Sequence, residues 1–84
     1  MIRNRDAKAK YEGITTFRGI SLKDSNSLMR ESLITTNQYL KKIYTMFSMI
    51  ADGMDIPEEL WVPRENILVL FPHSLGTEKV GCFC

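Results

Sequence analysis

Hydrophobic residues in the middle of the chain recur at helical spacing. Between residues 25 and 52 they follow one another in alternating steps of four and three positions. This spacing places them on one face of a helix and matches the a and d positions of three heptads. The stripe consists of Met29, Leu33, Leu40, Ile43, Phe47 and Ile50, with polar Thr36 in its one gap. We therefore predict one long amphipathic helix over residues 25–52.

Capping residues stand at both ends of this predicted helix. Residues 24–27 are all small and polar, which is typical of a helix start, and Gly53 supplies a C-terminal stop. A second interpretation comes from Thr35 and Gln38, which have the three-residue separation of a capping box. That interpretation divides the segment into two helices with a kink between them. The unbroken stripe favours a single helix, because a break would turn the two halves out of phase.

The rest of the chain predicts short elements around the helix. Residues 1–12 are polar and basic and form a frayed or helical arm. Residues 13–22 are rich in β-branched and aromatic residues and predict a strand, bent at Gly19. Residues 55–61 predict a short helical turn that ends at Pro63. Residues 67–71 and 78–84 predict a β-hairpin across a turn at 72–77. We expect one α+β domain over residues 1–84: strand, long amphipathic helix, short helical turn, β-hairpin.

Composition indicates a small cytoplasmic protein. The chain has 84 residues, of which 44% are hydrophobic, so it can form a core but only a small one. Chains of this size often gain stability from oligomerisation. The longest apolar run, residues 67–71, is far too short to cross a membrane, and the charged first residues do not resemble a signal peptide. Two cysteines in the last three positions do not make a secreted disulfide framework.

Charge is unevenly distributed along the chain. Residues 1–42 carry a net charge of +5 and residues 43–84 a net charge of −4. The two halves can attract each other within the fold, or the basic half can meet an anionic partner. In the second case the chain would be a nucleic-acid-binding module. Its contact residues would be the basic side chains of the first half, Arg3, Arg5, Lys8, Lys10, Arg18, Lys23 and Arg30.

Few residues offer chemistry at a catalytic or metal site. Cys82 and Cys84 would share one face of a strand and could bind zinc or copper(I) together with His73. Three ligands are too few for a structural zinc site, so we expect two reduced cysteines and an exposed histidine. The last three residues also resemble the prenylated tail of small vesicle-traffic GTPases. The phosphate loop of those proteins is absent from this chain. We therefore expect no cofactor, no metal and no enzyme.

The predicted helix has a wider apolar face than two or three short strands can cover. Aromatic residues and methionine are enriched at protein interfaces, and two-fold dimers are the commonest oligomers. We expect a small regulator or inhibitor that docks on another protein and forms a homodimer through this helix. By analogy of class alone, such proteins are often accessory factors of phages or mobile elements. The predicted interface comprises Leu33, Tyr39, Leu40, Ile43, Tyr44, Met46, Phe47 and Ile50.

Overall fold

A three-stranded antiparallel sheet with β1 at its centre organises the fold. The computed structural model describes residues 1–77. Strand β1 (Ile14–Phe17) pairs with β2 (Ile20–Ser21) on one edge and with β3 (Leu75–Thr77) on the other. The helices are α1 (Asn4–Lys10), α2 (Ser25–Ile34), α3 (Gln38–Ala51) and α4 (Arg64–Leu70), and a 3₁₀ turn, η1, spans Glu58–Leu60. The predicted α+β class and the short turn near residues 55–61 are confirmed.

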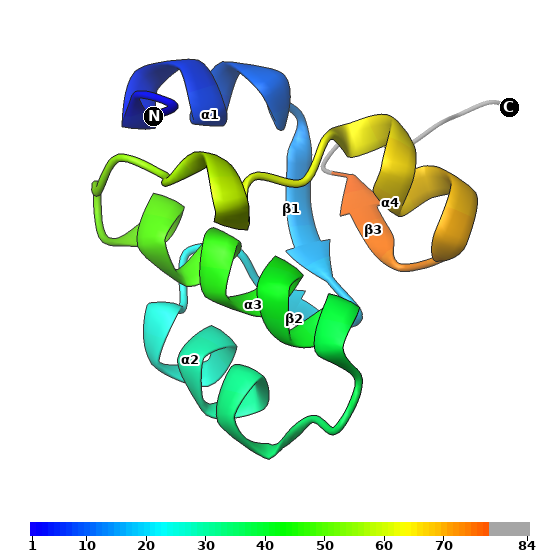
Figure 1. Ribbon diagram of the computed structural model, residues 1–84. Helices are drawn as coiled ribbons and strands as arrows, with labels where there is room; N and C mark the ends of the chain where they lie inside the picture. The colour runs from blue at the N-terminus through cyan, green and yellow to red at the C-terminus, as the bar shows by residue number, and fades with distance from the viewer. Residues whose placement is uncertain (78–84) are drawn as a thin grey trace, which may run out of the picture.

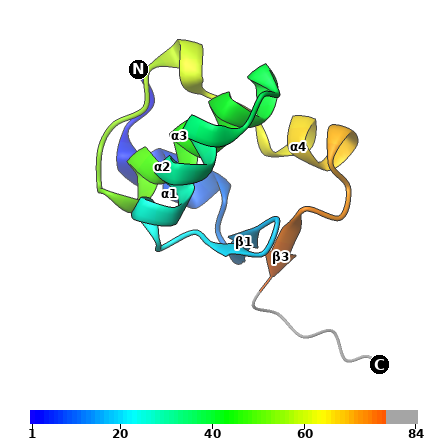
Figure 2. The ribbon, with the colours of Figure 1, turned by 90° about the horizontal axis from the view of Figure 1, so that it is seen from below.

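Helix α3 runs through the middle of the molecule, with α1 on one side and α2 on the other (Figure 1). Seen from below, the strands lie together beneath α2 and α3, and α4 stands to the right (Figure 2). Aromatic rings join these layers. The Phe17 ring of β1 lies 5.1 Å from the Tyr44 ring and 5.4 Å from the Phe47 ring of α3. On the other side, Tyr11 after α1 lies 5.0 Å from Phe47. The core therefore surrounds α3.

The expected strand over residues 13–22 is a hairpin of two strands. Phe17 pairs with Ile20, so Arg18 and Gly19 form the two-residue turn between them. Both have positive φ angles, 54° and 85°, as the tightest hairpin turns require. Gly19 takes this conformation without steric cost, which explains the bend expected at that position. The opposite edge carries Gly76, where an added Cβ would collide with Thr16 Oγ1.

The single helix predicted over residues 25–52 is wrong: the segment forms two helices. Residues 35–37 between α2 and α3 leave the helical conformation, with ψ of 141° at Thr35 and 117° at Asn37. Asn37 Oδ1 accepts hydrogen bonds from the backbone N–H groups of Tyr39 and Leu40 at 2.9 and 3.0 Å. This side chain satisfies donors that a new helix leaves unpaired, and so it begins α3. The two-helix interpretation is confirmed, with Asn37 rather than Thr35 as the cap.

The ends of these two helices follow the expected signals. Asp24 caps α2 by accepting a hydrogen bond from the N–H of Ser27 at 3.1 Å. This bond, together with a second one donated by the Ser27 hydroxyl at 2.8 Å, holds the pKa of the Asp24 carboxyl below its ordinary value. After α3, Gly53 has a φ of 79°, the left-handed conformation expected for a helix stop. Among residues 1–77, no helix combines the length and apolar character that a membrane crossing requires.

The basic N-terminal residues are packed on the fold and do not form a loose arm. Ile2 and Ile56 exchange two backbone hydrogen bonds, at 2.8 and 2.7 Å. The Asn4 side chain donates to the carbonyl of Ile50 at 3.1 Å, and Ala7 is fully buried. The N-terminal ammonium lies 3.6 Å from the Glu58 carboxylate. The helical alternative for residues 1–12 is therefore correct. The ion pair with Glu58 also joins the basic N-terminal half of the chain to its acidic C-terminal half.

The strand predicted over residues 67–71 is also wrong, because these residues lie in α4 and its C-cap. Pro63 precedes the helix with φ of −62°, and its carbonyl accepts the N–H of Asn66 at 3.1 Å. Pro72 follows the C-cap residue Phe71, at a position where proline is common after a helix. The return strand expected over residues 78–84 lies outside the described residues. The sheet is instead completed by β3, within the segment expected to be a turn.

Candidate functional site

Most of the predicted interface lies in the core of the chain. Because α1, α2 and the sheet together cover α3, its apolar face is buried without a partner. Six of the predicted residues are buried: Leu40, Ile43, Tyr44, Met46, Phe47 and Ile50. Tyr39 is half-buried, and its ring stacks 6.3 Å from that of Phe71. Leu33 alone remains well exposed, at 70%.

The seven basic residues proposed to contact nucleic acid are exposed or partly exposed but do not gather on one element. Four of them, Arg3, Arg5, Lys8 and Lys10, belong to α1 or its N-cap. The other three are Arg18 in the β1–β2 turn, Lys23 before α2 and Arg30 within α2. Helices α1 and α2 flank opposite sides of α3 (Figure 1). The arrangement therefore separates the α1 cluster from Arg30 instead of forming one basic stripe.

The candidate metal ligands do not assemble in the described part of the chain. His73 is exposed in the turn after α4. Cys82 and Cys84 lie outside the described residues. Within residues 1–77, no three His, Cys, Asp or Glu side chains are grouped so that they could hold a metal ion. Two acidic residues near η1, Asp55 and Glu58, contact the N-terminal segment instead. Asp55 Oδ1 accepts the backbone N–H of Asn4 at 2.9 Å.

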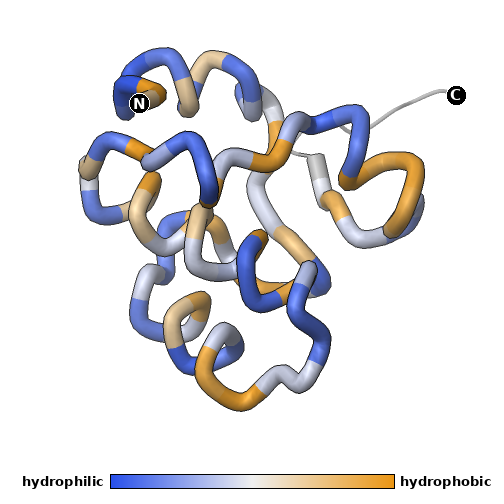
Figure 3. The backbone as a smooth tube through the Cα atoms, viewed as in Figure 1, coloured by the Kyte–Doolittle hydropathy of each residue, from blue (hydrophilic) through white to orange (hydrophobic). Residues whose placement is uncertain are grey.

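An exposed apolar surface occupies the C-terminal half of α4. We call it the α4 surface, and it consists of Leu68, Val69 and Leu70. Their exposed fractions are 43%, 76% and 56%. Figure 3 shows this part of α4 as a hydrophobic segment on the outside of the molecule. Contiguous exposed apolar groups are found at interaction sites of soluble proteins, so these residues are the candidate interaction surface of α4.

The α4 surface faces outward because of how α4 is anchored. Ile67 is fully buried, and the Phe71 ring packs 6.5 Å from the Phe17 ring. Residues four positions apart lie on the same side of a helix, so these two anchors face the core together. The three residues between them are exposed, Val69 most of all. On a strand, by contrast, Val69 would share the inner face with Ile67 and Phe71.

A buried hydrogen bond holds the segment that leads into α4. Tyr11 is 5% exposed, and its hydroxyl donates to the backbone carbonyl of Val62, next to Pro63. Burial raises the pKa of the Tyr11 hydroxyl well above its ordinary value. The Trp61 ring lies edge-on to the Tyr11 ring at 5.8 Å. Together these contacts fix the position of the residues just before α4. They therefore also fix the position of α4 and of its exposed surface.

A second exposed apolar patch lies at the end of α2. We call it the α2 surface, and it consists of Met29, Leu33 and Ile34, which are 40%, 70% and 63% exposed. Leu28 and Ser32 face the core in their place. The heptad stripe over residues 25–52 places Met29 and Leu33 on the same helix face as the core residues of α3. The break at residues 35–37 ends that register, so the stripe does not continue from α3 into α2.

Sequence reasoning missed the α4 surface because it treated residues 67–71 as a buried strand. A signal was present in the flanking prolines. Pro63 stands just before the segment and Pro72 just after it, with acidic Glu65 in the first turn. This arrangement is typical of a short helix. Once the segment is helical, its apolar residues cannot all face the core.

Comparison with known proteins supplies no relative for this chain. No protein-family model matches it. No curated protein and no solved structure matches it at a significant level.

Proposed function

We propose that this chain is a non-enzymatic protein-binding domain, a regulator or inhibitor, that docks on another protein through the α4 surface. The observation that carries the proposal is the outward position of Leu68, Val69 and Leu70 on a helix fixed to the core by Ile67. Exposed apolar groups gain free energy when a partner removes them from water. Their side chains are aliphatic, so the complementary surface on the partner would be apolar.

The proposed partner is a different protein and not a second copy of the chain. The homodimer expected from the sequence relied on eight residues, of which six are buried in the core. Leu33 on the α2 surface is the one strongly exposed member of that set. Sedimentation at high protein concentration tests this point, since the proposal expects a monomer. A dimer that Leu33→Asp dissociates would instead support the original interface.

Site-specific photocrosslinking in cells that produce the chain tests the proposed docking surface. A benzophenone amino acid at position 69 should yield a discrete protein adduct, because Val69 is 76% exposed at the centre of the α4 surface. The matched control places the same group at Lys10, which is exposed on α1. The adduct should disappear when Leu68→Ser and Leu70→Ser are added. The same adduct from both positions, or one that survives these substitutions, would contradict the proposal.

A further inference from the structure

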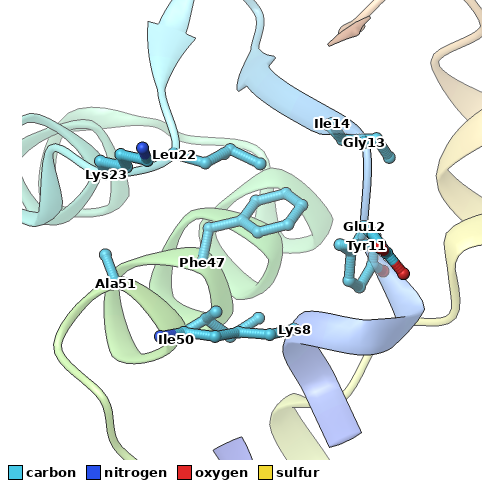
Figure 4. Close-up of a pocket in the computed structure, with 10 residues that line it drawn as sticks. All are labelled: Lys8, Tyr11, Glu12, Gly13, Ile14, Leu22, Lys23, Phe47, Ile50 and Ala51. Carbon is cyan, nitrogen blue, oxygen red and sulfur yellow. The ribbon is translucent and has the colours of Figure 1, made fainter. Parts of the chain in front are cut away.

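A separate cavity of about 340 Å³ lies between α1, the start of β1 and α3. Its size falls in the lower part of the range for small-molecule sites, about 300–1,000 Å³. No residue of α4 lines it, so this cavity is distinct from the α4 surface. Figure 4 shows the Phe47 side chain between Leu22 on one side and Ile50 on the other.

The inner wall of the cavity is apolar. Phe47 and Ile50 come from α3, Ile14 comes from β1, and Leu22 follows β2. Phe47, Ile50 and Ile14 are core residues with little exposure, so their positions are fixed by packing. A wall of this kind receives an aromatic or aliphatic group and offers it no hydrogen bonds.

The mouth of the cavity carries two lysines from separate elements. Lys8 of α1 and Lys23 before α2 both line the cavity, and they lie on opposite sides of Phe47 (Figure 4). Within residues 1–77 the one ion pair joins the N-terminal ammonium to Glu58, so no carboxylate of that part of the chain lies within 4 Å of either lysine ammonium group. Glu12 also lines the cavity, but it lies beside Tyr11, away from the two ammonium groups (Figure 4). The lysine side of the mouth is therefore positive.

We propose that this cavity binds a small amphipathic carboxylate, an aromatic or short aliphatic acid. The apolar body of the acid would rest against Leu22, Ala51 and the exposed edge of Ile50, and its carboxylate would face Lys8 and Lys23. An uncharged analogue would keep the apolar contact but lose the attraction of the two ammonium groups. A cationic analogue would be repelled by them. The cavity therefore selects by charge as well as by shape.

A nuclear magnetic resonance titration of the full chain with 2-naphthoate tests this site. The backbone amide signals of Gly13, Leu22 and Ala51 should shift, since these residues line the cavity. 2-Naphthylmethanol and 2-naphthylmethylamine serve as the neutral and cationic analogues. We expect the naphthoate to bind most tightly and the amine most weakly. Equal affinity for the three compounds, or shifts confined to other parts of the chain, would overturn the proposal.

Lysine variants test the contribution of charge. Replacement of Lys8 or Lys23 by glutamine should weaken naphthoate binding about two- to fivefold each, the effect of an exposed ion pair. Binding of the neutral analogue should not change. Lys10→Gln is the matched control, because Lys10 is exposed on α1 but does not line the cavity. A double variant, Lys8→Gln with Lys23→Gln, that binds naphthoate like the unmodified chain would overturn the assignment.

Discussion

The hydroxyl of Tyr11 donates a hydrogen bond to the backbone carbonyl of Val62, which is 51 positions further along the sequence. This contact ties the residue after α1 to the segment that leads into α4. Replacement of Tyr11 by phenylalanine keeps the ring in the core but leaves a buried carbonyl without its donor. We expect the free energy of unfolding to fall by about 1–3 kcal/mol.

Urea denaturation of Tyr11→Phe measures this loss. Tyr39→Phe is the control, because Tyr39 is half-buried and its ring contact with Phe71 does not involve the hydroxyl. The control should change stability by less than about 0.5 kcal/mol. Equal effects of the two substitutions would show that the Tyr11 hydroxyl contributes nothing specific.

Alkaline pH should destabilise the fold through its buried tyrosines. Burial raises the pKa of both Tyr11 and Tyr44 above the ordinary tyrosine value of about 10. Above that pH the unfolded chain loses these protons while the folded chain retains them. The folded state therefore binds more protons, and its stability decreases as pH rises. The melting temperature should be steady near pH 8 and fall above about pH 10.

The Tyr11→Phe variant provides the control for this pH dependence. It lacks the more strongly shifted of the two groups, so its melting temperature should fall less steeply at high pH. Because Tyr44 remains, part of the dependence should persist. A slope identical to that of the unmodified chain would contradict the assignment to Tyr11.

The junction between α2 and α3 can be tested by the sign of one substitution. Asn37 caps α3 through its Oδ1 atom, so Asn37→Ala should lower the free energy of unfolding by about 1 kcal/mol. In one continuous helix, the same change would replace a poor helix former with the best one and raise stability. Thermal or urea unfolding distinguishes the two results directly. A stabilised variant would contradict the two-helix arrangement.

The orientation of α4 predicts opposite outcomes for two neighbouring aliphatic residues. Ile67 is fully buried and Val69 is 76% exposed. Ile67→Ala should cost about 2–5 kcal/mol of stability, because it leaves a cavity in the core. Val69→Ala should change stability by about 0.5 kcal/mol or less. Urea denaturation of both variants is the measurement. Large losses in both would indicate a strand, on which these side chains share one face.

The sequence predicts the class of the fold better than the path of the chain. Heptad spacing correctly identified the apolar face of α3, because Leu40, Ile43 and Phe47 follow a helical period whether or not the helix continues upstream. The pattern extended that face too far upstream, because it treated polar Thr36 as a single exception within one continuous helix. The local hydrogen bonds of Asn37 outweigh the pattern there.

Six of the eight residues of the predicted interface are buried for a reason of tertiary packing. The width of the apolar face of α3 was evident in the sequence, but the elements that cover it were not. Ala7 and Tyr11 place α1 on that face, although residues 1–12 are polar and basic overall. Conversely, the apolar run at residues 67–71 predicts a buried strand, whereas its helical form leaves Val69 exposed. Burial depends on which elements, far apart in the sequence, pack against each other. The local pattern of hydrophobic residues does not contain this information.

The most direct test of the docking proposal compares two exposed apolar residues on different surfaces. Val69 on the α4 surface and Leu33 on the α2 surface have similar exposure, 76% and 70%. Val69→Asp and Leu33→Asp should both fold, and calorimetry would measure the affinity of each for the protein captured by crosslinking. We predict that Val69→Asp weakens binding at least about tenfold, as loss of a contact worth more than 1 kcal/mol does, while Leu33→Asp binds like the unmodified chain. Loss of binding in Leu33→Asp with full binding in Val69→Asp would contradict the account.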